Sequence, residues 1–123
     1  MNNRILVVDD DADTLHLIKV KLSKSGYEVE IARDGKSGFE LATHHDADLV
    51  ILDLMMPGED GFSTCQRIKS EMDNPPIVLI LSGKGEEEHI ASAFTHGADD
   101  YMIKPFSPSE LEERVRVNLI RYK

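Results

Sequence analysis

Five short runs of apolar residues recur along the chain, and longer stretches with helical periodicity separate them. The runs are Ile5–Val8, Tyr27–Ala32, Asp48–Leu52, Ile77–Leu81 and Tyr101–Ile103. Several of these runs are apolar throughout rather than alternating with polar residues. Continuous apolar runs are typical of strands that are covered on both faces in a parallel sheet. The pattern therefore predicts five parallel strands.

The stretches between the runs predict helices. The first, over residues 14–24, places Leu15, Ile18 and Leu22 on one side, and either Asp11 or Asp13 can cap its start. Further helices are predicted over residues 36–43, 62–72 and 86–96, and a last helix opens at residues 107–110. A helix thus follows each predicted strand.

This alternation of strand and helix predicts a doubly wound α/β sandwich. Right-handed crossovers leave few topologies, and the expected strand order in the sheet is 2-1-3-4-5. That order makes the first and third strands neighbours, at the point where the winding of the chain reverses. Ligands of such folds bind outside the carboxyl ends of the strands at this switch point.

Composition and charge narrow the class of protein. A chain of 123 residues fits one domain with its own core, and no apolar run approaches the ~20 residues of a transmembrane helix. No signal peptide precedes the first strand, and a single cysteine excludes an internal disulfide, which favours a reducing cytoplasm. The formal net charge of -9 argues against direct binding to nucleic acid or to anionic membranes.

Charged residues stand where three of the predicted strands end. Asp9 and Asp10 follow the first strand, Asp53 follows the third, and Lys104 follows the fifth. Two carboxylates about 4 Å apart repel by about 4 kcal/mol at an effective dielectric constant of 20. Such a cluster must shift a pKa, spread apart or hold a cation. Mg²⁺ suits an all-oxygen site that also receives a phosphate, and the absence of convergent histidines argues against zinc.

Two further side chains suit a phosphoryl group at the same edge. The Lys104 ammonium offers three hydrogen-bond donors, and Ser82 adds a hydroxyl at the end of the fourth strand. A nucleophilic carboxylate at Asp53, a divalent cation and a cationic clamp are the parts needed to form an aspartyl phosphate. The sequence therefore predicts metal-assisted phosphoryl chemistry.

Four motifs on these strand ends resemble those of the receiver domain of bacterial two-component response regulators. They are ILVVDD at residues 5–10, DLMMPGEDG at 53–61, LSG at 81–83 and GADDYMIKPF at 97–106. The resemblance covers essentially the whole chain and is strongest to CheY-like receivers of the OmpR/PhoB type. It implies a flavodoxin-like (βα)5 fold and one receiver domain over residues 1–123, which is either a stand-alone protein or the N-terminal part of a longer one.

The resemblance also implies a role for each acidic residue of the site. Asp53 matches the phosphoacceptor, which takes a phosphoryl group from a sensor histidine kinase or a phosphotransfer protein. Asp10 matches the main carboxylate that binds Mg²⁺ or Mn²⁺, and Asp9 lies beside it. The resemblance also implies that Asp53 itself and the backbone carbonyl of Met55 complete the metal site.

The remaining matched residues concern the phosphoryl group and the switch. Lys104 matches the phosphoryl-binding lysine, and its peptide bond to Pro105 is expected to be cis. Ser82 matches the switch hydroxyl. Tyr101 matches the switch aromatic, which turns inward when the hydroxyl moves to the phosphoryl group. Phosphorylation is then expected to change a surface made by the fourth helix, the fifth strand and the fifth helix, and so to signal to an output domain or a downstream protein.

Two other functions stay open at this stage. One is a small magnesium-dependent phosphohydrolase with Asp53 as its nucleophile, although the sequence offers neither a cap domain nor a second acid or base. The other is a degenerate receiver that serves only as a binding module, against which the intact set of acids argues. The favoured interpretation is a cytoplasmic signalling switch that assists only its own phosphorylation and dephosphorylation, and is otherwise not an enzyme.

A phosphorylation-dependent homodimer is a further expectation, and one residue departs from it. Receivers of the OmpR/PhoB type dimerise through charge pairs, and Asp99, Asp100, Glu110, Arg114 and Arg116 fit that scheme. Ile90, however, stands where that branch usually has a basic residue, so Glu110 loses its partner. Separately, we hypothesise that Met55 and Lys84 flank the phosphoryl group and restrict attacking water, which would prolong the phosphorylated state.

Overall fold

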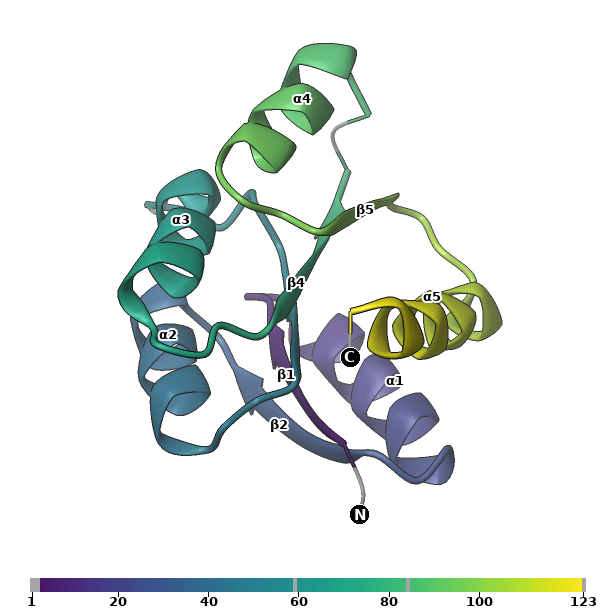
Figure 1. Cartoon of the computed structure of the whole chain (residues 1–123). Coiled ribbons are helices and arrows are strands. Elements are labelled where there is room, and N and C mark those ends of the chain that lie inside the picture. The colour runs from purple at the N-terminus through teal and green to yellow at the C-terminus, as the bar shows by residue number, and fades with distance from the viewer. Residues whose placement is uncertain (1–2, 59, 84, 123) are drawn as a thin grey trace.

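The computed structural model describes residues 3–58, 60–83 and 85–122, in which strands and helices alternate along the chain (Figure 1). The strands are β1 (Arg4–Val8), β2 (Glu28–Ala32), β3 (Leu49–Leu52), β4 (Ile77–Ser82) and β5 (Asp100–Ile103). The helices are α1 (Ala12–Lys24), α2 (Gly35–His44), α3 (Gly61–Glu71), α4 (Glu87–Thr95) and α5 (Pro108–Arg121).

The strands form one parallel sheet in the order β2-β1-β3-β4-β5, which confirms the predicted topology. Figure 1 shows the two layers of helices, with α1 and α5 on one face of the sheet and α2, α3 and α4 on the other. β1 and β3 are neighbours, and Val8 is in register with Leu52. The residues that follow these two strands therefore emerge side by side.

The core has two parts because both faces of the sheet are covered. Leu49 and Ile51 of β3 pack into the cluster beneath α1 and α5, whereas Val50 and Leu52 pack beneath α2, α3 and α4. All four side chains are at most 1% exposed. Full burial of a side chain of this size contributes roughly 1.5–3 kcal/mol, so a strand between two helical layers is stable only if it is apolar on both faces.

Side-chain caps set the boundaries of several helices. Asp11 caps α1 by accepting hydrogen bonds from the Asp13 amide at 3.1 Å and the Thr14 hydroxyl at 2.8 Å. The helix therefore begins at Ala12, two residues before the predicted start. Ser107 caps α5 in the same way. In the described part of the chain, no helix is long and apolar enough to cross a bilayer.

Candidate functional site

The site lies at the carboxyl ends of β1 and β3, where the backbone holds two aspartates next to each other. The Asp53 amide donates to the Val8 carbonyl at 2.9 Å, and the Asp9 amide donates to the Ala32 carbonyl at 3.1 Å. These bonds continue the sheet ladder by one residue at each strand end. As a result, Asp9, Asp10 and Asp53 each offer a carboxylate oxygen, and these oxygens lie within 4.8 Å of one another.

The ammonium of Lys104 lies close to two of these acids. Lys104 Nζ lies 2.9 Å from Asp9 Oδ2 and 3.6 Å from Asp53 Oδ2. The other oxygen of each carboxylate accepts a backbone hydrogen bond, from the Asp11 amide for Asp9 at 2.9 Å and from the Met55 amide for Asp53 at 3.2 Å. Asp9 and Asp53 are 2% and 5% exposed, respectively, so two carboxylates share one ammonium away from bulk water.

Burial and charge shift the pKa values at this site in the directions that its crowding implies. Burial raises the pKa of Asp53 above its ordinary value; repulsion from Asp9 and Asp10 adds to this, while the Met55 amide and Lys104 oppose it. Partial burial works against the Lys104 ammonium, but the hydrogen bond to Asp9 and the attraction of Asp53 raise its pKa overall. The site therefore favours the charged form of Lys104 and disfavours the ionised form of Asp53.

The charge balance of the site fits a hard divalent cation. Three carboxylates and one ammonium leave two negative charges uncompensated when all are ionised. The ligand atoms are oxygens, which Mg²⁺ prefers. Asp10 is the most accessible of the three acids, so the site is open toward solvent on its side. Met55 stands two residues after Asp53 with its side chain half exposed.

The predicted switch residues lie on the two strands that follow β3 in the sheet. Ser82 ends β4 and is fully buried, and its carbonyl accepts a hydrogen bond from the Lys104 amide at 2.8 Å. The peptide bond between Lys104 and Pro105 is cis, as the family resemblance implies. Tyr101 on β5 is 8% exposed and packs with Ala93 and Ala98. Its ring thus lies inward in this structure.

One residue near the site was not expected from the sequence. Arg33, in the loop after β2, donates from Nη2 to the backbone carbonyl of Asp10 at 3.2 Å. An arginine in a polar loop gives no sequence signal of this contact, because such residues are usually solvated. Lys84, which we expected beside the phosphoryl group, and Glu59 of the second motif lie outside the described residues.

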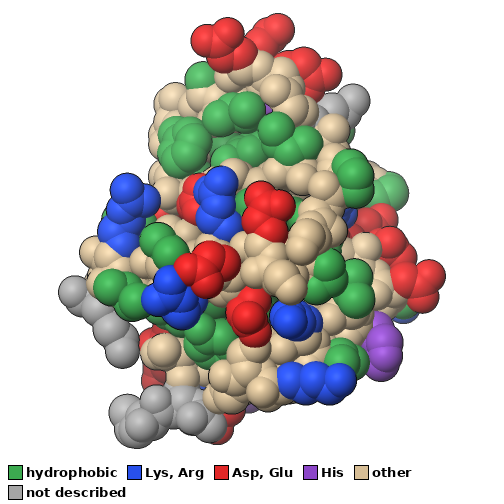
Figure 2. All heavy atoms as spheres, turned by 90° about the vertical axis from the view of Figure 1, so that its right-hand side faces the viewer, with side chains coloured by type: hydrophobic (Ala, Val, Ile, Leu, Met, Phe, Trp, Pro, Cys, Tyr) green, Lys and Arg blue, Asp and Glu red, His purple; other side chains and the backbone are tan. Residues whose placement is uncertain are grey.

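The surface of α4, β5 and α5 divides into an apolar part and a charged part. Figure 2 shows hydrophobic side chains gathered over α4, above a mixture of acidic and basic groups. Arg114 donates to both carboxylate oxygens of Asp100, at 3.0 and 3.1 Å, and Arg116 pairs with Glu113. Asp99 pairs with Lys69. Four of the five charged residues expected to pair across a dimer, all but Glu110, are therefore bonded within the chain.

Comparison with known proteins identifies the family to which this chain is similar. The profile described as the response regulator receiver domain matches residues 5–116. Two regulators of Bacillus subtilis are similar to this chain. The uncharacterized transcriptional regulatory protein YrkP is 44% identical over 122 residues, which are 99% of this chain and 52% of YrkP. The alkaline phosphatase synthesis regulator PhoP is 41% identical over 121 residues, 98% of this chain and 50% of PhoP. The chain thus spans about half the length of the curated relatives it matches.

Solved structures are similar over the whole fold. The receiver domain of the Francisella response regulator 1452 superposes with a TM-score of 0.90 at 35% identity, covering 99% of this chain and 100% of that chain. The BeF3-activated N-terminal receiver domain of RstA from Klebsiella pneumoniae superposes with a TM-score of 0.86 at 29% identity, covering 95% and 98%. Taken with the profile match and the acidic strand ends, these similarities show that the chain belongs to the response regulator receiver domain family.

Proposed function

We propose that this receiver domain accepts a phosphoryl group on Asp53 and thereby relays a signal through the surface of α4, β5 and α5. The observation that carries the proposal is the crowding of Asp9, Asp10 and Asp53 around the single ammonium of Lys104. A structural ion pair needs only one acid for one base. A site that binds a divalent cation and a phosphoryl group needs several carboxylates for the cation and a basic group for the phosphoryl oxygens.

Asp53 is the nucleophile in this proposal, and its surroundings hold it in place. The Met55 amide fixes Oδ1, while Oδ2 faces Lys104. The donor is the phosphohistidine of a sensor histidine kinase or a phosphotransfer protein. The bond from phosphorus to the histidine nitrogen breaks, a bond from phosphorus to an Asp53 oxygen forms, and the histidine leaves as neutral imidazole once it is protonated. Lys104, whose ammonium lies near both Asp9 and Asp53, is proposed to bind a phosphoryl oxygen.

Asp9, Asp10, Asp53 and the Met55 carbonyl are the groups proposed to hold Mg²⁺ or Mn²⁺ at this site. The bound cation supplies neutralising charge next to the phosphoryl oxygens. Arg33 holds the backbone of Asp10 and so steadies the loop that carries the most accessible of the acids. The chain's own residues therefore provide the nucleophile, the oxygen ligands and the cationic clamp.

The relay is proposed to use Ser82 and Tyr101. Lys104 is bonded through its backbone to Ser82, and Tyr101 lies on the same strand as the residues leading to Lys104. New negative charge on Asp53 would draw Lys104 and the Ser82 hydroxyl toward it, and the loop after β4 would follow. The recipient is proposed to be an output domain or a downstream protein, because relatives about twice as long are described as transcriptional regulators.

We also propose that residues 1–123 form one receiver domain, stand-alone or N-terminal in a longer protein, and that it acts in the cytoplasm without binding nucleic acid or membrane directly. A phosphorylation-dependent homodimer would require Asp100 and Arg114 to exchange their internal pair for one between copies. Ile90 still leaves Glu110 without a basic partner in that scheme.

Labelling with acetyl phosphate and Mg²⁺ tests the proposal. We expect intact-mass spectrometry to find one phosphoryl group per chain, and the tyrosine fluorescence, to which Tyr101 contributes, to differ between labelled and unlabelled protein. Chelation of the metal should prevent labelling. Asp53→Asn should not be labelled, whereas the matched control Asp13→Asn, which changes an exposed acid of α1, should be labelled like the wild type.

Three results would contradict this function. Labelling of Asp53→Asn would move the phosphoacceptor elsewhere. A failure of the wild type to label in Mg²⁺ would favour a binding module. Continued turnover of a generic phosphoester, in place of labelling that stops at one group, would favour a phosphohydrolase.

A further inference from the structure

A polar cavity lies away from the proposed phosphorylation site, at the edge of the sheet. It has a volume of about 390 Å³ and is bordered by the starts of β1 and β2, the end of α2 and the loop that follows α2. This volume is at the lower end of the range for small-molecule sites. The cavity adjoins Arg4 to Leu6, at the opposite end of β1 from Asp9. A ligand there would not occupy the phosphorylation site.

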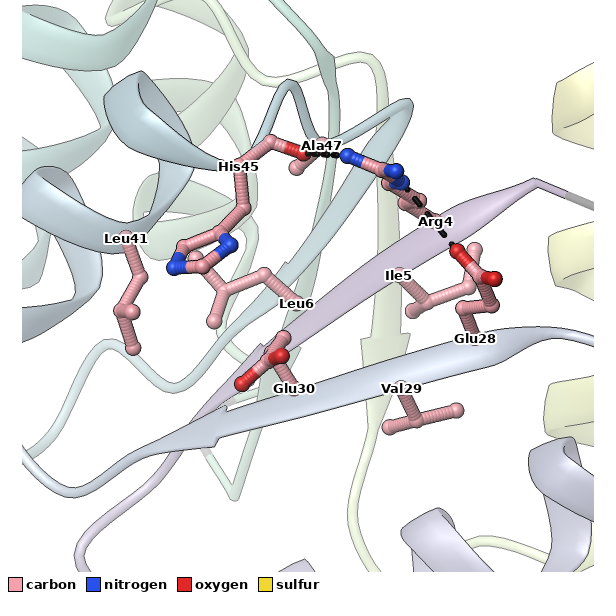
Figure 3. A pocket seen from close by; sticks show the side chains of 9 residues that line it. All are labelled: Arg4, Ile5, Leu6, Glu28, Val29, Glu30, Leu41, His45 and Ala47. Carbon is pink, nitrogen blue, oxygen red and sulfur yellow. Dashed lines mark hydrogen bonds and ion pairs between the residues drawn. The ribbon is translucent and has the colours of Figure 1, made fainter.

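The floor and the walls of this cavity differ in chemistry. Leu6 is buried and Leu41 half buried, and they give the cavity an apolar side. Figure 3 shows the carboxylate of Glu30 and the imidazole of His45 reaching toward the same space, one from β2 and the other from the end of α2. The cavity therefore combines an apolar surface with two polar groups on facing elements.

The charges that line the cavity do not cancel. The Arg4 guanidinium is paired within the protein, because Nε donates to Glu28 at 3.1 Å and Nη1 donates to the His45 carbonyl at 3.0 Å. Figure 3 shows it turned toward these partners. Among the described residues, neither the Glu30 carboxylate nor the His45 ring has a hydrogen bond or an ion pair with the protein. One negative charge is thus left over on the wall of the cavity.

We propose that this cavity binds a small organic monocation, an amine or guanidine carried on a short apolar body. The cationic group pairs with Glu30 and donates to an imidazole nitrogen of His45, while the apolar body lies on Leu6 and Leu41. An anion is disfavoured because the only guanidinium of the cavity is already neutralised by Glu28. A neutral ligand would gain no ion pair with the Glu30 carboxylate.

The probe is 2-phenylethylamine, titrated into ¹⁵N-labelled protein in saturating Mg²⁺, which keeps the amine from the Asp9–Asp53 site. We expect amide shifts to concentrate at Leu41, His45 and Ala47. The neutral analogue 2-phenylethanol and the anionic 3-phenylpropionate have similar shapes. We expect the amine to bind about fivefold more tightly than the alcohol, the upper end for an ion pair at a surface, and the acid to bind most weakly.

Two variants separate the charge from the shape of the cavity. Glu30→Gln keeps the size of an exposed side chain and should remove the preference for the amine over the alcohol. The matched control Glu40→Gln removes an exposed acid of α2 that does not line the cavity, and it should keep that preference. Thermal melts check that both variants fold like the wild type.

The proposal would be overturned by equal binding of amine and alcohol, by an unchanged preference in Glu30→Gln, or by shifts that concentrate near Asp9 and Asp53. None of these results depends on whether Asp53 can be phosphorylated. Failure of this proposal and failure of the proposed phosphorylation are therefore distinguishable.

Discussion

The two ends of the sheet hold their charged groups in opposite ways. At the amino end of β4, Lys69 Nζ lies 2.8 Å from Asp99 Oδ2 and donates to the Pro76 carbonyl at 3.0 Å. The same Asp99 oxygen accepts from the Val78 amide at 2.9 Å. Here one acid meets one base. At the carboxyl end, Lys104 faces the acids Asp9, Asp10 and Asp53.

This difference separates a structural ion pair from the site at which we propose phosphorylation. The pair of Lys69 and Asp99 links α3 to the loop before β5, and its charges cancel, so it has nothing to offer a ligand. The carboxyl end keeps a surplus of negative charge, and burial with repulsion raises the pKa of Asp53. The Asp99 and Asp53 side chains are both largely shielded from water. The two ends therefore differ in the balance of acidic and basic groups rather than in burial, and the proposed phosphorylation site lies at the end with surplus negative charge.

Removal of the lysine at the balanced end should have the largest effect on stability. Lys69→Met leaves the Asp99 carboxylate, whose side chain is 18% exposed, without its cation. We expect a loss of about 2–3 kcal/mol in the free energy of unfolding, somewhat less than for breaking a fully buried pair. Urea unfolding measures it. The matched control Lys19→Met, an exposed lysine of α1, should change stability by less than about 0.5 kcal/mol.

A loss in Lys69→Met no larger than in Lys19→Met would contradict the comparison. It would mean that the hydrogen bond from the Val78 amide is enough to keep Asp99 in place.

At the unbalanced end, removal of a charge should stabilise the protein. Because the pKa of folded Asp53 is raised, the folded state binds more protons than the unfolded state between the ordinary value of 3.8 and the raised value. Stability contributed by this group therefore falls as the pH rises through that window, and ionised Asp53 is destabilising at pH 7. We expect Asp53→Asn to melt a few degrees higher in a chelator at pH 7, which corresponds to roughly 1 kcal/mol.

The pH dependence provides the control for this prediction. Below the ordinary pKa the wild-type carboxyl is protonated in both states, so the advantage of Asp53→Asn should shrink there. Asp13→Asn, at an exposed position, should show no such gain at pH 7. A lower melting temperature for Asp53→Asn at pH 7 would mean that the hydrogen bonds of this carboxylate outweigh its repulsion.

The cluster of acids at the carboxyl end of the sheet was predictable from the sequence, because the strand order alone brings these positions together. A parallel sheet in the order β2-β1-β3 places the residues after β1 and β3 together, whatever their side chains are. Asp9 and Asp53 needed only to follow continuous apolar runs. The strands were likewise predictable, since a strand covered on both faces must be apolar throughout.

The balanced end was not predictable in the same way. Lys69 and Asp99 are 30 residues apart, and their pairing depends on where the end of α3 meets the loop before β5. From the sequence, Lys69 resembles any solvated lysine, and the resemblance favours a dimer contact for Asp99. The hydrogen bond from Arg33 to the Asp10 carbonyl and the cavity beside Glu30 were unpredictable for the same reason. They depend on how distant segments pack together, and no sequence pattern around these residues indicates that packing.

The smallest predicted effect concerns the lifetime of the phosphorylated state, which depends on water rather than on charge. The Met55 side chain is 50% exposed and stands two residues beyond Asp53. If its apolar thioether restricts attacking water, Met55→Asn should speed dephosphorylation about fivefold, equivalent to about 1 kcal/mol in the barrier, while Met55→Leu should leave the rate unchanged.

The decay of labelled protein, followed by intact-mass spectrometry, measures this rate. Labelling itself should be preserved, since the Met55 amide that holds Asp53 is present in each variant. An unchanged or slower decay in Met55→Asn would show that this end of the sheet governs the phosphoryl group through its charges alone.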